Sequence, residues 1–434
     1  MKILKKRSFR IRPSTLLSVF MILLFANSTF GQEKKQVPNG TDGLMLNVPP
    51  VDSSVKKMPP NEFVGSAATF KIGIGYIHDA VTYIKSDEFN KQLDSANLSM
   101  DPMIKVRDFR VLGSGVFRTK RPLSFKFAFM YDGDKETWMV RESGLTIGVP
   151  ELFGNIFIGR TKEGYSLVKV MNGHSPWTAE RQMALDVVPI LADGIKWFGS
   201  LPKSKIFWNL GYYNDILSEG QGFSTFKWQT VARVGWLPYY DKEKQRVLHI
   251  AANFRYGAPL NGQMTLKSRP ESNPSPFLIN TGSFAADHST STGGEIYYST
   301  GRLLLGSEMM VHKFTADGED SHSFFGGDIV ATYMLTKTKR PYNTTSSVFG
   351  FVKVNSSVFK KGWGEWEAVL RYSTLDLDDK SILGGKFWRI TPMINWYMTK
   401  NLRSEFVYGY GIWDRYNLKG AVQFFQYRIQ LTVL

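Results

Sequence analysis

The sequence contains no cysteine, and its acidic residues are few relative to its basic ones, with 38 Asp and Glu against 54 Lys and Arg over 434 residues. The absence of cysteine excludes a fold that depends on disulfides, which small exported domains usually need. The net charge is +16, and six of these charges lie in residues 1–31, which leaves +10 for the remainder. Its cations are scattered singly, which argues against a nucleic-acid binder and favours a basic, water-filled interior.

Long hydrophobic runs are also scarce. A helical membrane protein needs several apolar runs of about 20 residues, but the mean hydropathy here is only −0.21 and the one candidate run lies at the N-terminus. There, basic residues from Lys2 to Arg12 precede a short apolar stretch, Leu16 to Phe25, and small residues precede Gln32. This pattern predicts a cleaved signal peptide, residues 1–31, and it disfavours a signal anchor because the apolar run is short.

Residues 32–62 contain five prolines among polar residues and show no sustained periodicity. We expect them to form an extended periplasmic tail, followed by a single folded domain over residues 63–434.

Strict alternation is the main feature of that domain. In Gly364 to Leu377, Trp366 and Leu370 fall on one strand face while Glu367 and Arg371 fall on the other. Aromatic faces opposite lone cations recur along the chain, and aromatic residues make up 14% of it. An outer-membrane barrel needs such strands, because each strand has lipid on one side and water on the other.

Seventeen segments between Ala67 and Leu434 show strand character, one of them Ser347 to Asn355. We therefore predict an all-β fold, a transmembrane antiparallel barrel of about 16 strands, which is wide enough for an aqueous channel. Short connections such as Tyr131 to Asp134 are expected at the periplasmic end.

Two connections are long, Thr161 to Asp193 and Pro259 to Thr290. The first is the candidate constriction loop, because Arg160 and Lys162 enter it directly from a strand. Glu163 and the pair Glu180-Arg181 are positioned to brace it by ion pairs. We expect this loop to fold into the barrel and narrow it.

Cations on the polar face of each strand should point into the barrel, because a charge facing lipid near the midplane costs roughly 2–4 kcal/mol. Glu367 lies on the same face as Arg371 and is expected to orient it or to cancel part of its field. The residues predicted to line an anion pathway are Lys126, Arg160, Lys162, Lys196, Arg233, Arg255, Arg371 and Arg428.

Catalytic and metal-binding patterns are weak. The six histidines show no HExxH or HxH spacing. His174-Ser175 lies in a loop beside Pro176, and the glycines in Gly73-Ile74-Gly75 lie inside a strand with no helix after them. No nucleophile, base and orienting group occur together, so we expect no enzymatic activity, no metal and no cofactor.

Seven short sequence pieces occur in an order that resembles the phosphate-selective porin O and P family over most of Ala67 to Leu434. These pieces are Tyr76 to Asp79, Arg107 to Gly115, Ile156 to Ser166 with Glu180-Arg181, Leu335-Thr336 with Arg340 and Tyr342, Gly364 to Glu367, Arg371 to Ser373, and Asn395 to Tyr397. The sequence departs from the family pattern at Asp108 and at its terminal Val433-Leu434. The resemblance implies a homotrimer of 16-stranded barrels in the outer membrane of a Gram-negative cell, with a basic lumen that passes phosphate or related small anions.

Other channel functions use the same barrel. The sequence leaves open a general or sugar-conducting porin and a structural outer-membrane barrel without phosphate selectivity. Because most aromatic residues fall on the lipid-facing side, they favour interfacial girdles over a sugar-binding slide.

Overall fold

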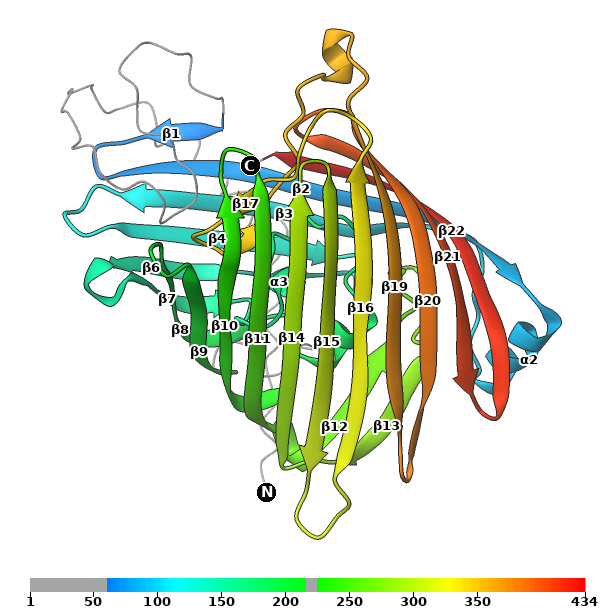
Figure 1. Ribbon diagram of the computed structural model, residues 1–434. Coiled ribbons are helices and arrows are strands. Elements are labelled where there is room, and N and C mark those ends of the chain that lie inside the picture. The colour runs from blue at the N-terminus through cyan, green and yellow to red at the C-terminus, as the bar shows by residue number, and fades with distance from the viewer. Residues whose placement is uncertain (1–60, 216–224, 434) are drawn as a thin grey trace, which may run out of the picture. The chain divides into compact units, whose positions relative to one another are not determined.

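The computed structural model describes residues 61–215 and 225–433, and every structural statement here refers to these residues (Figure 1). The expected signal peptide and nearly all of the expected tail lie outside them. No helix in the described ranges is long and apolar enough to cross a membrane.

The described chain forms one closed antiparallel barrel of 16 strands. Its sheet contains 18 strands, because β1 (Glu62–Val64) adds a short piece to β2 and because β5 and β6 together make one wall strand, interrupted at Arg141 and Glu142. The barrel strands are β2 (Ala68–Lys85), β3 (Met103–Phe117), β4 (Leu123–Asp132), β5 (Thr137–Val140) with β6 (Ser143–Val149), β7 (Gly154–Thr161), β8 (Ala192–Leu201), β9 (Ile206–Asn214), β10 (Phe226–Asp241), β11 (Arg246–Pro259), β14 (His288–Thr300), β15 (Leu303–Thr315), β16 (His322–Met334), β19 (Glu365–Asp379), β20 (Ile382–Tyr397), β21 (Leu402–Arg415) and β22 (Leu418–Val433).

The barrel closes where the last strand pairs with the first. Residues Ile74 to Lys85 of β2 lie antiparallel to Val422 to Val433 of β22. Closure pairs the two strands that would otherwise be the open edges of the sheet, as a membrane-embedded sheet requires.

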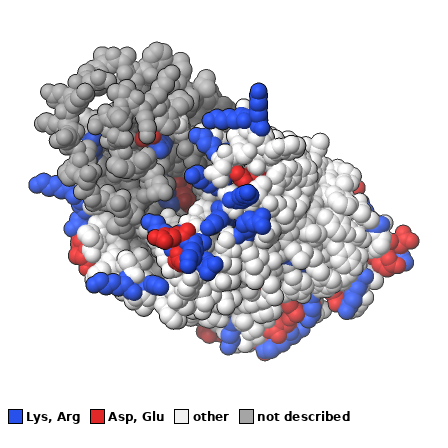
Figure 2. Space-filling model, turned by 45° about the horizontal axis from the view of Figure 1, so that its top comes forward, with Lys and Arg blue, Asp and Glu red and all other residues white. Residues whose placement is uncertain are grey.

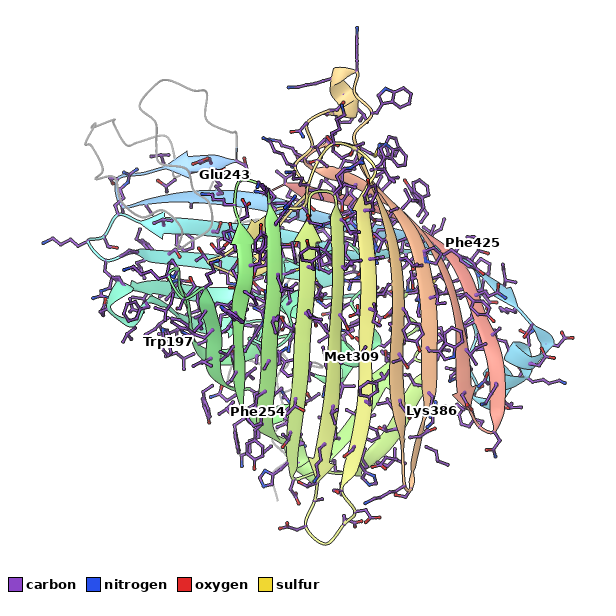
Figure 3. All side chains as sticks on the ribbon, viewed as in Figure 1. Trp197, Glu243, Phe254, Met309, Lys386 and Phe425 are labelled. Atoms are coloured by element: carbon purple, nitrogen blue, oxygen red, sulfur yellow. The ribbon has the colours of Figure 1, made fainter. Side chains whose placement is uncertain are left out.

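Side chains alternate between the two faces of the wall. Along β19, Val369, Arg371 and Ser373 are buried inside, whereas Leu370 and Tyr372 are exposed outside. Figure 2 shows a broad uncharged wall with Lys, Arg, Asp and Glu gathered towards its edges. In Figure 3, Phe254 and Phe425 lie on the wall, and both side chains are exposed on the outside. This apolar outer belt is the lipid-facing surface predicted from the alternation.

We call the end where β2 begins and β22 ends the proximal end, and the other end the distal end. The turn after Tyr131 lies at the distal end, since β4 runs from the proximal end to Asp132. The fold alone does not assign either end to the periplasm, so the expectation that this turn is periplasmic stays a prediction.

The connections hold the remaining elements. The β2 to β3 connection carries α2 (Asp87–Ser95), which is capped by Ser86, and η2 (Pro150–Leu152) lies between β6 and β7. The β7 to β8 connection carries α3 (Leu167–Val170) and η3 (Met183–Val187). The β11 to β14 connection carries η4 (Leu260–Gly262), β12 (Gln263–Ser268) and β13 (Ile279–Ala285), and the β16 to β19 connection carries β17 (Tyr342–Asn343), β18 (Val348–Phe349) and η5 (Val358–Lys360).

Sixteen of the seventeen predicted strands overlap barrel strands, and the prediction for Ser347 to Asn355 is wrong. Only β18 forms there, and it pairs with β17 and not with the wall. The segment is rich in apolar residues, but several of their side chains face other protein groups. Phe349 packs against Trp177, and Val352 is buried with Met334 and Tyr397.

Candidate functional site

Three inserted segments enter the barrel interior, wholly or in part. We call them the constriction loop (residues 162–191), the distal insert (260–287) and the proximal insert (335–364). Two of them correspond to the long connections of the sequence, and the third contains the segment that was predicted as a strand.

The constriction loop crosses the interior from β7 to the opposite wall. Trp177 packs on Tyr297 of β14 with 5.7 Å between ring centroids, and its carbonyl accepts a 2.7 Å hydrogen bond from the Asn395 side chain of β20. His174 Nδ1 lies 2.8 Å from the hydroxyl of Thr432 on β22. The expectation that this loop folds inward is confirmed.

The first turn of the loop is fixed by local capping. Ser166 has a left-handed φ of 70°, and its hydroxyl accepts a 3.2 Å hydrogen bond from the backbone N–H of Lys169, at the start of α3. The N–H of Ser166 donates to Asn253, and the N–H of Val168 donates to Glu308. Two wall strands therefore satisfy the free donors of this short helix.

The distal insert covers the distal end of the interior. Its Glu271 carboxylate pairs with Arg371 of β19 and lies 3.5 Å from Arg389 of β20. Its Ser275 hydroxyl lies 3.0 Å from the phenol of Tyr83 on β2. The insert thus reaches across the barrel from β11 to β2.

The proximal insert enters from the other end. Arg340 donates to both carboxylate oxygens of Glu367 on β19, at 2.8 and 3.0 Å. The phenol of Tyr342 lies 2.7 Å from His249 Nδ1 on β11. Because Glu367 pairs with Arg340, it does not orient Arg371, and that alternative is wrong; the other alternative, that Glu367 cancels part of the field of Arg371, stays a prediction. The carboxylate that contacts Arg371 is Glu271.

Four of the arginines predicted to line the pathway point inward but are nearly fully buried against carboxylates, with only 1–2% of each residue exposed. The pairs are Arg233 with Glu295, Arg255 with Glu163, Arg371 with Glu271 and Arg428 with Asp79. A fifth predicted residue, Arg160, is also buried and pairs with Asp193 of the neighbouring strand at 2.7 Å. These side chains tie the inserts and strands together.

Three other predicted residues lie together around Glu142, and we call them the lysine cluster: Lys126, Lys162 and Lys196. Lys126 lies 2.6 Å from Glu142, and about 30% and 26% of these two side chains are exposed. Lys162 is 3.9 Å from the same carboxylate. Lys126 and Lys196 both lie over the ring of Phe157, which faces the interior, at 5.0 and 5.3 Å.

Four arginines near this cluster were not among the predicted residues, and we call them the arginine group: Arg107, Arg110, Arg141 and Arg181. Arg107 forms a bidentate pair with Glu180, at 2.6 and 2.9 Å. Arg110 contacts Asp108 at 2.6 Å. One buried nitrogen of Arg110 and one of Arg181 have no hydrogen-bond partner in the described part of the chain.

Strand irregularities explain why alternation did not find two of these four residues, Arg107 and Arg141. The pairing of β2 with β3 skips Arg107, so this residue bulges and lies on the same side as Asp108. Arg141 lies at the break between β5 and β6. The available signal was the run from Arg107 to Arg110 and the pair Glu180-Arg181, which entered only through the family resemblance.

The two cationic sets act on each other electrostatically. Burial lowers the pKa of Lys162 well below its ordinary value; the Glu142 carboxylate opposes this shift, and Arg181 and Arg141 add to it. Burial and Arg107 also lower the pKa of Arg181, to about 10. Burial is the main cause of both shifts, and the neighbouring arginines add to them because like charges repel; an entering anion would relieve part of this repulsion.

No group of three or more His, Asp or Glu side chains is arranged to hold a metal ion within the described ranges. The side chains that distinguish this interior are the cations, which supply hydrogen-bond donors and positive charge.

Comparisons with known proteins agree with this architecture. The family model for phosphate-selective porin O and P matches residues 155–431. No curated protein matches the sequence.

Solved structures share the fold at low sequence identity. OmpT of Vibrio cholerae is 12% identical with a TM-score of 0.53, and the match covers 86% of this chain and 100% of that one. An anion-selective porin from Comamonas acidovorans is 11% identical with a TM-score of 0.53, covering 84% and 100%. The outer membrane channel DcaP of Acinetobacter baumannii is 9% identical with a TM-score of 0.54, covering 85% and 99%.

Proposed function

This chain belongs to the phosphate-selective porin O and P family and forms an outer-membrane channel, and we propose that the channel selects anions and carries phosphate or a related oxyanion by diffusion. The barrel supplies the path through the membrane, and no energy input or cofactor is needed. The family and the fold point to a channel and not to an enzyme.

The observation that carries the proposal is the concentration of cations near Glu142. The lysine cluster and the arginine group bring seven basic side chains together with Asp108, Glu142 and Glu180. An arginine fork grips two oxygens of a phosphate, whereas a lysine offers a movable point charge. Several such sites in sequence attract an anion without trapping it.

The buried arginines have a different role in this proposal. Arg233, Arg255, Arg371 and Arg428 hold the inserts in place, because each is matched by a carboxylate and is shielded from water. The anion path then runs along the wall from β3 to β8, past Lys126, Lys162 and Lys196. Arg160 supports the strand pair at the entrance to the constriction loop.

We extend the proposal to assembly and export. One solved OmpT structure is described as a trimer form, and the family resemblance also implies a homotrimer. A cleaved signal peptide over residues 1–31 would deliver the chain to the outer membrane.

The test is a planar-bilayer measurement with the purified full chain in a KCl gradient, followed by addition of phosphate. We expect a reversal potential of anion-selective sign and a chloride current that phosphate blocks. A cation-selective sign would refute anion passage. Anion selectivity without phosphate block would leave a general anion porin and remove the oxyanion preference. Current reduced by added oligosaccharide would instead favour the sugar-conducting alternative.

A further inference from the structure

A short arm of the proximal insert, residues 353–364, projects beyond the proximal end of the barrel. In Figure 1 it is the amber loop with one helical turn, η5, that stands above the upper ends of β16 and β19. Phe359 and Trp363 are 80% and 83% exposed, the highest values among the large hydrophobic side chains that the structure describes. Two such side chains at one site, beyond the end of the barrel wall, indicate a surface that meets something other than water.

The arm is basic as well as aromatic. Lys353, Lys360 and Lys361 are exposed, and residues 350–364 contain no Asp or Glu. Each of these lysines can reach an anion without competition from a carboxylate on the same segment.

The arm continues the lipid-facing wall. The carbonyl of Trp363 accepts hydrogen bonds from the indole N–H groups of Trp366 and Trp396, at 3.0 and 2.9 Å. These two indoles stack 5.0 Å apart on the outward faces of β19 and β20. Trp363 therefore lies directly beside an aromatic pair at the edge of the apolar belt.

Two backbone contacts fix the arm in this position. The N–H of Val358 donates to the carbonyl of Met398, just after β20, and the N–H of Gly364 donates to the carbonyl of Ser356. Gly364 has a φ of 70°, and a Cβ there would lie 2.5 Å from the Tyr397 carbonyl. The chain can reverse this tightly only with glycine at this position.

We propose that this arm binds the phospholipid interface of the leaflet at the proximal end. Phe359 and Trp363 lie among the glycerol and upper acyl groups, and Lys360 and Lys361 contact the lipid phosphates. Tryptophan favours this depth because its ring is apolar and its N–H is polar. Anionic headgroups attract the lysines and so strengthen the binding further. Six of the seven connections between barrel strands at this end span at most five residues, whereas most of the long connections lie at the distal end, so the leaflet is the periplasmic one.

Lipid fits this surface better than a second protein copy. The arm is continuous with a wall that already faces lipid, and its charge is complementary to phosphate groups and would repel the same arm of another copy. The proposal rests on the barrel lying in a membrane and does not depend on anion selectivity.

The absence of cysteine allows a direct test. Trp363→Cys would be labelled with an environment-sensitive dye and the full chain reconstituted in phosphatidylcholine vesicles with or without phosphatidylglycerol. The matched control is Glu243→Cys in the β10 to β11 turn at the same end (Figure 3). We expect a blue-shifted emission at position 363, several-fold stronger quenching by a headgroup-attached quencher than at position 243, and weaker quenching by aqueous iodide.

A second variant tests the lysines. Adding Lys360→Glu and Lys361→Glu to the labelled Trp363→Cys chain should reduce quenching by the lipid-attached quencher in vesicles that contain phosphatidylglycerol. The same changes should have little effect in phosphatidylcholine alone.

Iodide quenching at position 363 equal to that at position 243 would overturn the proposal. Protection from iodide in detergent together with cross-linking between copies would also overturn it, in favour of a subunit contact. Gel mobility before and after heating shows whether each variant has folded, and conductance of the same vesicles reports separately on the channel.

Discussion

Arg428 on the last strand donates two parallel hydrogen bonds to Asp79 on the first barrel strand, at 2.6 and 2.7 Å. The two residues are direct partners in the ladder that closes the barrel. The same guanidinium also reaches Glu180 of the constriction loop, at 2.5 Å. One side chain therefore joins the seam of the barrel to the segment inside it.

The first prediction concerns this pair. Arg428→Ala should destabilise the barrel by about 3–5 kcal/mol, because it leaves the buried Asp79 carboxylate without its partner. Replacing both residues, with Arg428→Ala and Asp79→Asn, should lower the free energy of unfolding by less than the sum of the two single changes. Urea unfolding followed by intrinsic fluorescence measures both effects. Additive losses would show that the two side chains are not coupled.

The second prediction concerns selectivity. Lys126→Glu should shift the reversal potential towards cations, because it places a second carboxylate beside Glu142 in the proposed path. Lys242→Glu makes the same charge change in an exposed turn and should leave the potential unchanged. Equal potentials for wild type and Lys126→Glu would remove this side chain from the path.

The third prediction concerns the constriction loop. Deleting Asn172 to Ala179 removes the section that crosses to β14, β20 and β22, so the single-channel conductance should rise. Deleting Asp317 to Asp320 shortens an exposed connection and should leave conductance unchanged. A loop deletion that folds but conducts like the wild type would mean that another segment limits the current.

The barrel was predictable because lipid imposes one rule on every strand. Residues such as Leu370 and Arg371 must face opposite sides, so alternation alone located 16 wall strands. The prediction failed at Ser347 to Asn355, since β-branched and aromatic residues also gather in a segment that packs against other protein groups. The alternation rule failed again at Arg107, because a β-bulge there shifts the in-and-out alternation of the side chains by one residue.

The partners of the cations could not be read from the sequence. Asp79 and Arg428 are separated by almost the whole chain, and Glu271 reaches Arg371 only because the distal insert folds inward. Alternation gives the direction of a side chain, but not whether water or a carboxylate lies in front of it. The interior was therefore predicted as basic and open, whereas much of its charge is paired and buried.

The last prediction concerns the space that a glycine leaves for the constriction loop. A Cβ on Gly75 of β2 would lie 2.3 Å from the Cε1 atom of His174, so Gly75→Ala must displace this imidazole from Thr432. Overpacking of this kind typically costs about 1–3 kcal/mol. If the clash with His174 is the cause, the double variant with His174→Ala should be more stable than Gly75→Ala alone, because the smaller side chain leaves room for the new methyl group. Urea unfolding of the wild type, the two single variants and the double variant gives the coupling free energy between the two substitutions. If the double variant loses as much free energy of unfolding as the two single variants added together, then Gly75 is needed for the strand itself and not to leave room for the loop.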